Sequence, residues 1–445
     1  APGHEHVSMV VLQGQRPWPQ SGVSGNATLQ AQYEYCFDRS DTDTSRGAEN
    51  QWDCSVAGTT STDALNTTSR KISGTNATAT PDLGHRKTIE GIKWLKEKAP
   101  TTSYFVPAHL ERAGVYNPTG NRGFNIEHLR AFNNTAPNIA FGFESMPGHQ
   151  AADTRGEYSP NRGASLANPT AGVDSVGLGT YGGTGIYAAR IGGVWDALLG
   201  EGRNWWFFAS SYYHNRGSFG PDQRESNQDF LPGEYQKDYV MARKGTNNLS
   251  AEAIIDGLRS GNSFAGSGDL IDRLAFVACA ANPALPRAAF KALVEKAAAN
   301  AALKNGEVRI NGCATMGEKL VVAPGADVVV AIAVRDPQGK NFSPYSFPNP
   351  SLKQINITQP LDAPVLDHID VIGGNVTGFV SPTDTAKYAG QEGTAAASNP
   401  SAGIKKVPLQ DATSVTKAVS IQSETQPVAI FDRYGRLVGH ALFQL

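Results

Sequence analysis

The stretch that decides the fold class runs over residues 186–214 and reads IYAARIGGVWDALLGEGRNWWFFASSYYH. Its first part has the apolar spacing of a helix over 186–199, which Gly200 would end. Its second part, Trp205–Ala209, is an unbroken apolar run, typical of a strand that is covered on both faces. The run leads directly into polar residues that end at His214. A buried strand with polar residues after it predicts a parallel sheet whose functional site lies at the carboxyl ends of its strands.

The same alternation of helix and strand continues on both sides of this stretch. Apolar spacing and capping residues predict further helices, and short apolar runs predict further strands. The helices are expected over 82–98, 125–132 and 251–260, and the strands over 103–106 and 138–143. A long polar excursion, residues 14–82, interrupts the pattern. Residues 1–273 are therefore predicted to form an α/β domain.

The remainder of the chain, residues 274–445, has a different character. An alanine-rich helix is expected as an insert over 281–305, between two cysteines. Short strand-like runs separated by glycine and proline follow, at 307–310, 320–322, 328–334, 355–357, 368–372 and 427–431. This pattern predicts a β-rich, sandwich-like C-terminal region.

Three strands of the first region run into residues that can ligate metals. His109, Glu144 and His214 each lie at or just after the end of one such strand. Because carboxyl ends of parallel strands share one edge, these side chains are expected to meet there. Imidazole and carboxylate together suit zinc, manganese or iron. The alternative for each residue is structural, as a strand-end hydrogen bonder or a solvated loop acid.

Two further groups of residues could join this site. His4, Glu5 and His6 come directly before the apolar run 7–12, although a flexible chain end that binds stray metal is the alternative. Arg112 follows the first strand-end histidine and would donate hydrogen bonds to a phosphate group.

A separate acidic run could hold calcium. Asp38, Asp41 and Asp43 supply oxygen ligands, but the spacing of an EF-hand and its distal glutamate are missing. A turn stabilised by aspartate side chains is the alternative.

The chain has four cysteines, at positions 36, 54, 279 and 313. They form two local pairs, which are interpreted either as disulfides or as buried thiols. Disulfides would indicate an oxidising compartment, hence a periplasmic or secreted protein. The chain begins Ala-Pro-Gly-His-Glu-His without an initiator methionine, which predicts a processed or truncated product.

Composition excludes two classes of partner. The net charge is −2, so no electrostatic basis exists for binding nucleic acid. The most apolar stretch, 320–334, is interrupted by Pro324, Gly325 and Asp327, so no transmembrane helix and no membrane partner are expected.

Several short motifs, taken in order, resemble the PHP (polymerase and histidinol phosphatase) superfamily of metal-dependent phosphoesterases. They span about residues 1 to 275 and suggest a large bacterial protein with a C-terminal β-rich extension. The motifs are PGHEH at 2–6, VPAHLER at 106–112, GFESMPGHQ at 142–150, WWFFASSYYHN at 205–215, FLPGEYQK at 230–237, and LRSG at 258–261 with GDLI at 268–271.

The resemblance implies a distorted (β/α)7-type barrel with two or three divalent metal ions at the strand ends. It implies that metal-activated water hydrolyses a small-molecule phosphoester. By resemblance, Glu5 matches the bridging acid of the family, His109 its Ala-His ligand and His214 its late histidine. His6 would be a further ligand, beside His4.

The sequence departs from the family in two ways. The initial His-x-His strand is missing, so the barrel is expected to be incomplete at the N-terminus unless another segment or chain completes it. The aspartate expected two residues before His214 is Tyr212. Two alternatives to a phosphoesterase therefore stay open: a catalytically impaired scaffold or binding protein, and another metal-dependent hydrolase of the amidohydrolase kind.

Overall fold

The computed structural model describes the residues that form its helices, its strands and the turns next to them. These are residues 7–11, 29–37, 45–50, 52, 54–56, 83–108, 126–147, 180–181, 184–189, 191, 193–211, 232–233, 236–243, 249–267, 270–304, 308–324, 326–337, 366–374, 376, 378, 403–408, 415–421, 426–432 and 437–443.

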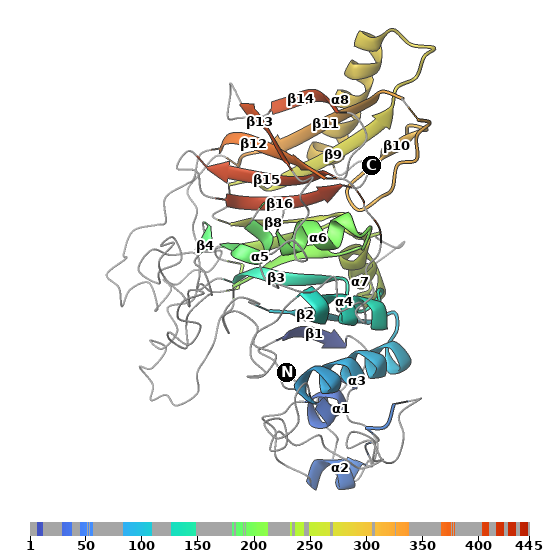
Figure 1. The fold of residues 1–445 in the computed structure, drawn as a ribbon, viewed down its shortest axis with the longest axis vertical. Helices are drawn as coiled ribbons and strands as arrows, with labels where there is room; N and C mark the ends of the chain where they lie inside the picture. Colours follow the sequence, from blue (N-terminus) through green and yellow to red (C-terminus); the bar gives the residue numbers. More distant parts are fainter. Residues whose placement is uncertain are drawn as a thin grey trace, which may run out of the picture.

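The first region is a layer of strands covered by helices (Figure 1). Its strands are β1 (Val7–Val11), β2 (Ser103–Pro107), β3 (Gly142–Pro147), β6 (Trp206–Ser210) and the small pair β4 (Thr180–Tyr181) and β5 (Thr184–Gly185). Its helices are α3 (Leu83–Lys98), α4 (Ile126–Thr135), α5 (Ile186–Ala189) and α6 (Val194–Gly200). β1 pairs with β2 in antiparallel orientation, and β3 pairs with β6 in parallel orientation.

These elements lie close to their expected positions, and α4 extends beyond the expected end at residue 132 to Thr135. Two other differences are larger. The helix expected over 186–199 is divided into α5, which ends at Ala189, and α6, which begins after Gly193, because glycine is unfavourable inside a helix. The strand expected over 138–143 begins only at Gly142. The residues before it form a turn, in which the Asn133 side chain donates a hydrogen bond to the Ala140 carbonyl at 3.0 Å.

Aromatic side chains fill the space between this layer and α6. Phe143 of β3 lies in edge contact with Trp195 of α6 and with Phe207 of β6, at centroid distances of 6.0 and 5.8 Å. The Trp195 indole N–H donates to the Trp205 carbonyl at 2.9 Å, so this buried polar group is satisfied. The predicted apolar run at 205–209 is thus buried throughout.

The predicted polar excursion, 14–82, contains two helices, α1 (Leu29–Phe37) and α2 (Ser45–Asn50). Tyr33 and Phe37 of α1 lie 5.8 and 6.1 Å from the Trp94 ring of α3, so α1 is anchored to the main core. The disulfide Cys36–Cys54 confirms the first predicted cysteine pair.

A buried ion network joins α4 to the turn after α6. Glu201 accepts hydrogen bonds from the Nε atoms of Arg130 and Arg203, at 2.5 and 2.6 Å. Arg203 also donates to Asn133 at 3.1 Å. All three charged residues are buried. The network lies where the chain enters β3 and β6, at the end opposite to their carboxyl termini.

The later part of the chain forms two further sheets. A six-stranded sheet has the order β13-β12-β15-β16-β8-β7, and a four-stranded sheet has the order β10-β9-β11-β14. Their strands are β7 (Gln236–Val240), β8 (Ser263–Ser267), β9 (Arg273–Ala280), β10 (Cys313–Ala314), β11 (Val328–Arg335), β12 (Leu366–Gly373), β13 (Gly403–Pro408), β14 (Val415–Ile421), β15 (Gln426–Asp432) and β16 (Leu437–Phe443). The six-stranded sheet joins β7 and β8 of the first predicted region to strands of the second (Figure 1).

Helix α8 (Arg287–Lys304) covers one face of the four-stranded sheet, and α7 (Ala251–Ser260) connects β7 to β8. Alternate residues of β11 pack against α8 on one face and toward β8 and β12 on the other, which explains its unbroken apolar sequence. The stretches 308–310 and 320–322, expected as strands, are irregular chain instead.

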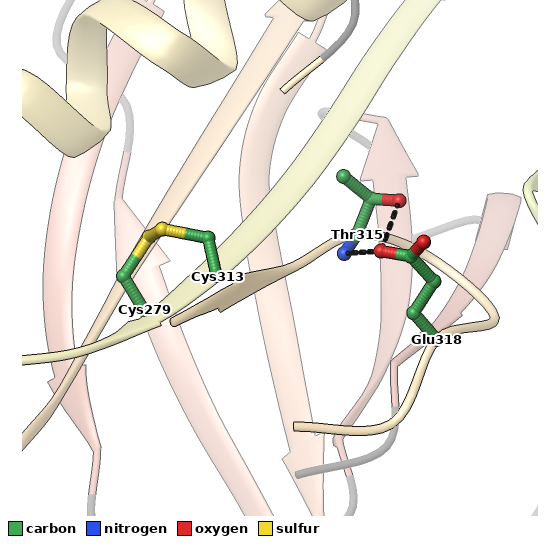
Figure 2. Close-up of a disulfide and its surroundings, with 4 residues drawn as sticks. All are labelled: Cys279, Cys313, Thr315 and Glu318. Atoms are coloured by element: carbon green, nitrogen blue, oxygen red, sulfur yellow. Dashed lines mark hydrogen bonds between the residues drawn. A yellow bond between two sulfur atoms is a disulfide. The ribbon is translucent and has the colours of Figure 1, made fainter. Parts of the chain in front are cut away.

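The second predicted cysteine pair is also confirmed. The disulfide Cys279–Cys313 joins residues that face each other on β9 and β10 (Figure 2). In the turn that follows, the backbone N–H and the hydroxyl of Thr315 both donate to the Glu318 carboxylate, at 2.8 and 3.1 Å (Figure 2). The bridge closes the segment that carries α8.

Two expectations at the level of the whole fold can be compared with the described residues. Their strands lie in separate hydrogen-bonded sheets, so the (β/α)7 barrel stays a prediction. None of their helices combines the length and apolar character that crossing a membrane requires.

Candidate functional site

The carboxyl ends of β3 and β6 lie side by side. The two strands are parallel, and Glu144 stands opposite Phe208 while Pro147 stands opposite Ser210. β2 packs beside β3, and the Phe105 N–H donates to the Ile139 carbonyl at 2.9 Å just before β3 begins.

The start of β1 adjoins the end of β2. Because the two strands are antiparallel, Val7 stands opposite Pro107. In the sequence, His6 is bonded to Val7, and His109 follows Pro107 by two residues. Val7, which directly follows His6, and Pro107, which lies two residues before His109, are therefore neighbours.

Glu144 is the predicted ligand that the structure describes in detail. It lies in β3 and is 3% exposed. Its neighbour Phe143 packs into the aromatic layer against α6, so Glu144 lies on the opposite face of the strand. A register shift between Glu144 and Met146 leaves Ser145 as an extra residue. Such bulges re-aim side chains near functional sites.

The site contains an acid that sequence reasoning missed. Asp238 of β7 accepts a hydrogen bond from the Ala209 backbone N–H at 2.9 Å, near the carboxyl end of β6. The residue as a whole is exposed, but its carboxyl group is desolvated by the surrounding chain. This desolvation raises the pKa of Asp238 to about 7, against the opposing effect of the Ala209 hydrogen bond. A carboxyl group that titrates near neutrality can both donate and accept a proton.

Gln236 accompanies Asp238 on the same strand and is also a residue that sequence reasoning missed. It is 2% exposed. Neither its Nε2 nor its Oε1 atom has a hydrogen-bond partner in the part of the chain that the structure describes. The signal in the sequence was weak: aspartate and glutamine are ordinary in loops, and only their place before Tyr-Val suggests a strand.

Most of the other predicted site residues lie outside the described residues. These are His4, Glu5, His6, His109, Arg112 and His214, together with Tyr212 and the proposed calcium ligands Asp38, Asp41 and Asp43. Among the residues that are described, no three His, Cys, Asp or Glu side chains gather into a group that could hold a metal ion. The metal and calcium sites therefore stay predictions.

The described part of the site thus combines a buried glutamate, a desolvated aspartate and a buried glutamine near the ends of neighbouring strands. Carboxylate oxygens fit the donor set of a divalent ion, and a neutral aspartic acid can serve as a proton donor. Comparison with family models, with curated proteins and with solved structures finds no match for this chain.

Proposed function

We propose that this chain is a metal-dependent phosphoesterase with a PHP-like barrel, acting at the carboxyl ends of β2, β3 and β6. The observation that carries the proposal is the strand register. Val7 stands opposite Pro107, and Glu144 stands in β3 directly beside β6. The strands that precede His109 and His214 in the sequence, β2 and β6, are both neighbours of β3, which holds Glu144, and β1, which follows His6, pairs with β2.

The residues proposed to hold two or three zinc, manganese or iron ions are His4, Glu5, His6, His109, Glu144 and His214. Glu144 fits such a site, because it is buried beside the neighbouring strand and its carboxylate supplies oxygen ligands of the kind that divalent metal ions bind. When bound, the ions would lower the pKa of a water molecule and offset negative charge that develops on the phosphoryl group. Arg112 is proposed to orient the phosphate through paired N–H donors.

Two confirmed disulfides support the further proposal that the protein works in an oxidising compartment, in the periplasm or outside the cell. A small-molecule phosphoester is the proposed substrate, and a further segment or chain is proposed to complete the barrel.

Metal analysis and hydrolysis assays on one preparation test the proposal. We expect the purified protein to retain at least one divalent transition metal per chain and to hydrolyse p-nitrophenyl phosphate. Chelation should abolish the activity, and manganese or zinc should restore it. Glu144→Gln and His214→Ala should each lower kcat/KM at least 100-fold, in line with the loss of a first ligand.

Glu90→Gln is the matched control for Glu144→Gln. Glu90 lies on α3, is also largely buried and accepts a hydrogen bond from Lys93 at 2.6 Å, so its loss should leave activity intact. Protein that stays metal-free and inert toward a panel of phosphoesters after metal loading would refute the phosphoesterase. It would instead favour the impaired scaffold or binding protein.

A further inference from the structure

The side chain of Gln236 raises a question that the proposed metal site does not answer. Its amide is buried, and within the described residues both of its polar atoms lack a partner. Leaving a buried donor and acceptor unsatisfied destabilises the folded state, because the hydrogen bonds that these groups make to water in the unfolded chain are not replaced. A bound ligand or an ordered water is one way in which a native protein satisfies such a group.

The amide faces the core of the first region. Residues two apart on a strand share one face, so Gln236 lies on the same face of β7 as Asp238. Asp238 reaches the Ala209 N–H on β6, which shows where this face points. On the neighbouring strand β8, Ala265 stands opposite Asp238 and is fully buried in the core that contains β3 and β6.

Gln236 also lies toward the carboxyl end of β6, where the candidate site is. At the other end of β7, Val240 stands opposite Ser263, which follows Gly261 in the chain. Gly261 lies against the Trp206 indole at the beginning of β6, where the Trp206 Nε1–H donates to the Arg259 carbonyl at 2.8 Å. β8 therefore runs in the direction of β6, and the Gln236 end of β7 lies beyond Ala209, toward the carboxyl end.

The chemistry of the pair selects a neutral ligand. A carboxamide offers both donors and an acceptor without charge, and the Asp238 carboxyl would repel an anion whenever it is ionised. Lys237, the cation between them in the sequence, lies on the other face of the strand with Tyr239, which stacks on Phe264 at 4.6 Å. Hydroxyl groups, which both donate and accept, match this combination.

We propose that Gln236 and Asp238 form a subsite that binds a neutral group with several hydroxyls, of the sugar or polyol class. Residues two apart on a strand are about 7 Å apart, which suits contacts to separate hydroxyls of one ligand. Only the identification of this group as the alcohol part of a phosphoester rests on the proposed function. The binding itself does not.

Ligand-observed NMR with the full chain tests the subsite without requiring catalysis. The probes are glucose, inositol and glycerol, with acetate as the anionic comparison. We expect saturation transfer to at least one neutral probe and none to acetate. Gln236→Leu, which removes both polar atoms at similar size, should lower that affinity at least fivefold. Lys237→Met, one residue away on the opposite face, should leave it unchanged.

Gln236→Asn provides a second variant if circular dichroism shows that Gln236→Leu does not fold. It keeps the amide but shortens the side chain by one methylene group. It should weaken binding at least threefold. Failure of every neutral probe to bind the wild-type protein overturns the subsite. So does unchanged binding by a folded Gln236 variant, which would mean that the amide holds only an ordered water. Binding that persists in a protein without phosphatase activity would refute the proposed reaction and leave the subsite standing.

Discussion

Asp238 of β7 accepts a hydrogen bond from the backbone N–H of Ala209 on β6, at a distance of 2.9 Å. This contact joins strands of two different sheets, the parallel pair β3–β6 and the six-stranded sheet. The carboxyl group thus takes a place that a backbone carbonyl would occupy in a continuous sheet. It also places a titratable group at the junction of the two sheets, near the carboxyl end of β6.

Asp238→Asn should make folding stability less sensitive to pH. Desolvation of its carboxyl group raises the pKa of Asp238 in the folded protein to about 7, from the ordinary value of 3.8. The wild type therefore has its full stability from this group below about pH 3.8 and loses it as the pH rises to about 7. Between about pH 3.8 and pH 7, the free energy of unfolding of the variant should therefore rise relative to that of the wild type. Above about pH 7 the difference should stay constant. Because the residue is exposed overall, solvent screening reduces the effect, and we expect about 1 kcal/mol.

Urea unfolding at a series of pH values measures this difference. Asp256→Asn on α7 is the control, because its side chain is 68% exposed. A wild-type stability that rises between pH 4 and pH 7, relative to Asp238→Asn, would contradict the prediction.

Substitutions at two glycines allow the cost of backbone strain to be measured separately from the cost of a steric clash. Gly261 and Gly233 have φ angles of +74° and +75°, which residues with a side chain rarely adopt. A Cβ on Gly261 would lie 2.6 Å from the Trp206 ring, whereas a Cβ on Gly233 meets nothing within 4 Å. Gly233→Ala should therefore cost only the strain, about 1–2 kcal/mol. Gly261→Ala should cost at least about 3 kcal/mol in chemical denaturation, since overpacking adds to the strain. Equal losses in the two variants would show that the indole moves aside without cost.

Glu201→Gln should destabilise the protein by about 3–5 kcal/mol, because it removes the carboxylate that two buried arginines contact. Glu97→Gln is the control, since Glu97 pairs with Lys98 at 2.6 Å on the surface. That change should stay within about 0.5 kcal/mol. Equilibrium unfolding in urea compares the two, and similar small losses would mean that water reaches the network.

Replacing either cysteine pair by serine should destabilise the chain through the entropy of the unfolded state. The bridges close segments of 18 and 34 residues, Cys36–Cys54 and Cys279–Cys313. Loop-closure entropy predicts losses of about 3 and 4 kcal/mol. Intact mass after alkylation, with and without reductant, checks that both bridges form, and unfolding curves give the losses. Free thiols in protein from an oxidising compartment would contradict the pairing.

The α/β part of the fold was predictable because its signals are local. Helix α7 has a serine cap whose side chain accepts the Ala253 N–H at 3.2 Å, and it ends at Gly261 in the left-handed region. Such caps can be seen in the sequence. The strand that begins at Gly142 was predicted to begin too early, because the apolar residues 139–141 resemble a strand. The side chain of Asn133, 7 residues before Ala140, holds them in a turn instead.

The candidate site was predictable only where a functional residue follows an apolar run. Glu144 follows such a run and is buried, as a ligand would be. Gln236 and Asp238 could not be found in this way, because their significance comes from the approach of β7 to β6, which no local pattern encodes. The aromatic contact between α1 and Trp94 could not be predicted for the same reason.

The pairing of β8 with β16 also has a consequence for biosynthesis. Gly266 stands opposite Gly439, so a strand beside the candidate site finds its partner far along the chain. Until β16 has been synthesised, the edge of β8 is open to intermolecular pairing. Nascent chains stalled before β16 should therefore be recognised by chaperones and cut readily by proteases, and this sheet should acquire its protected form only after β16 has left the ribosome.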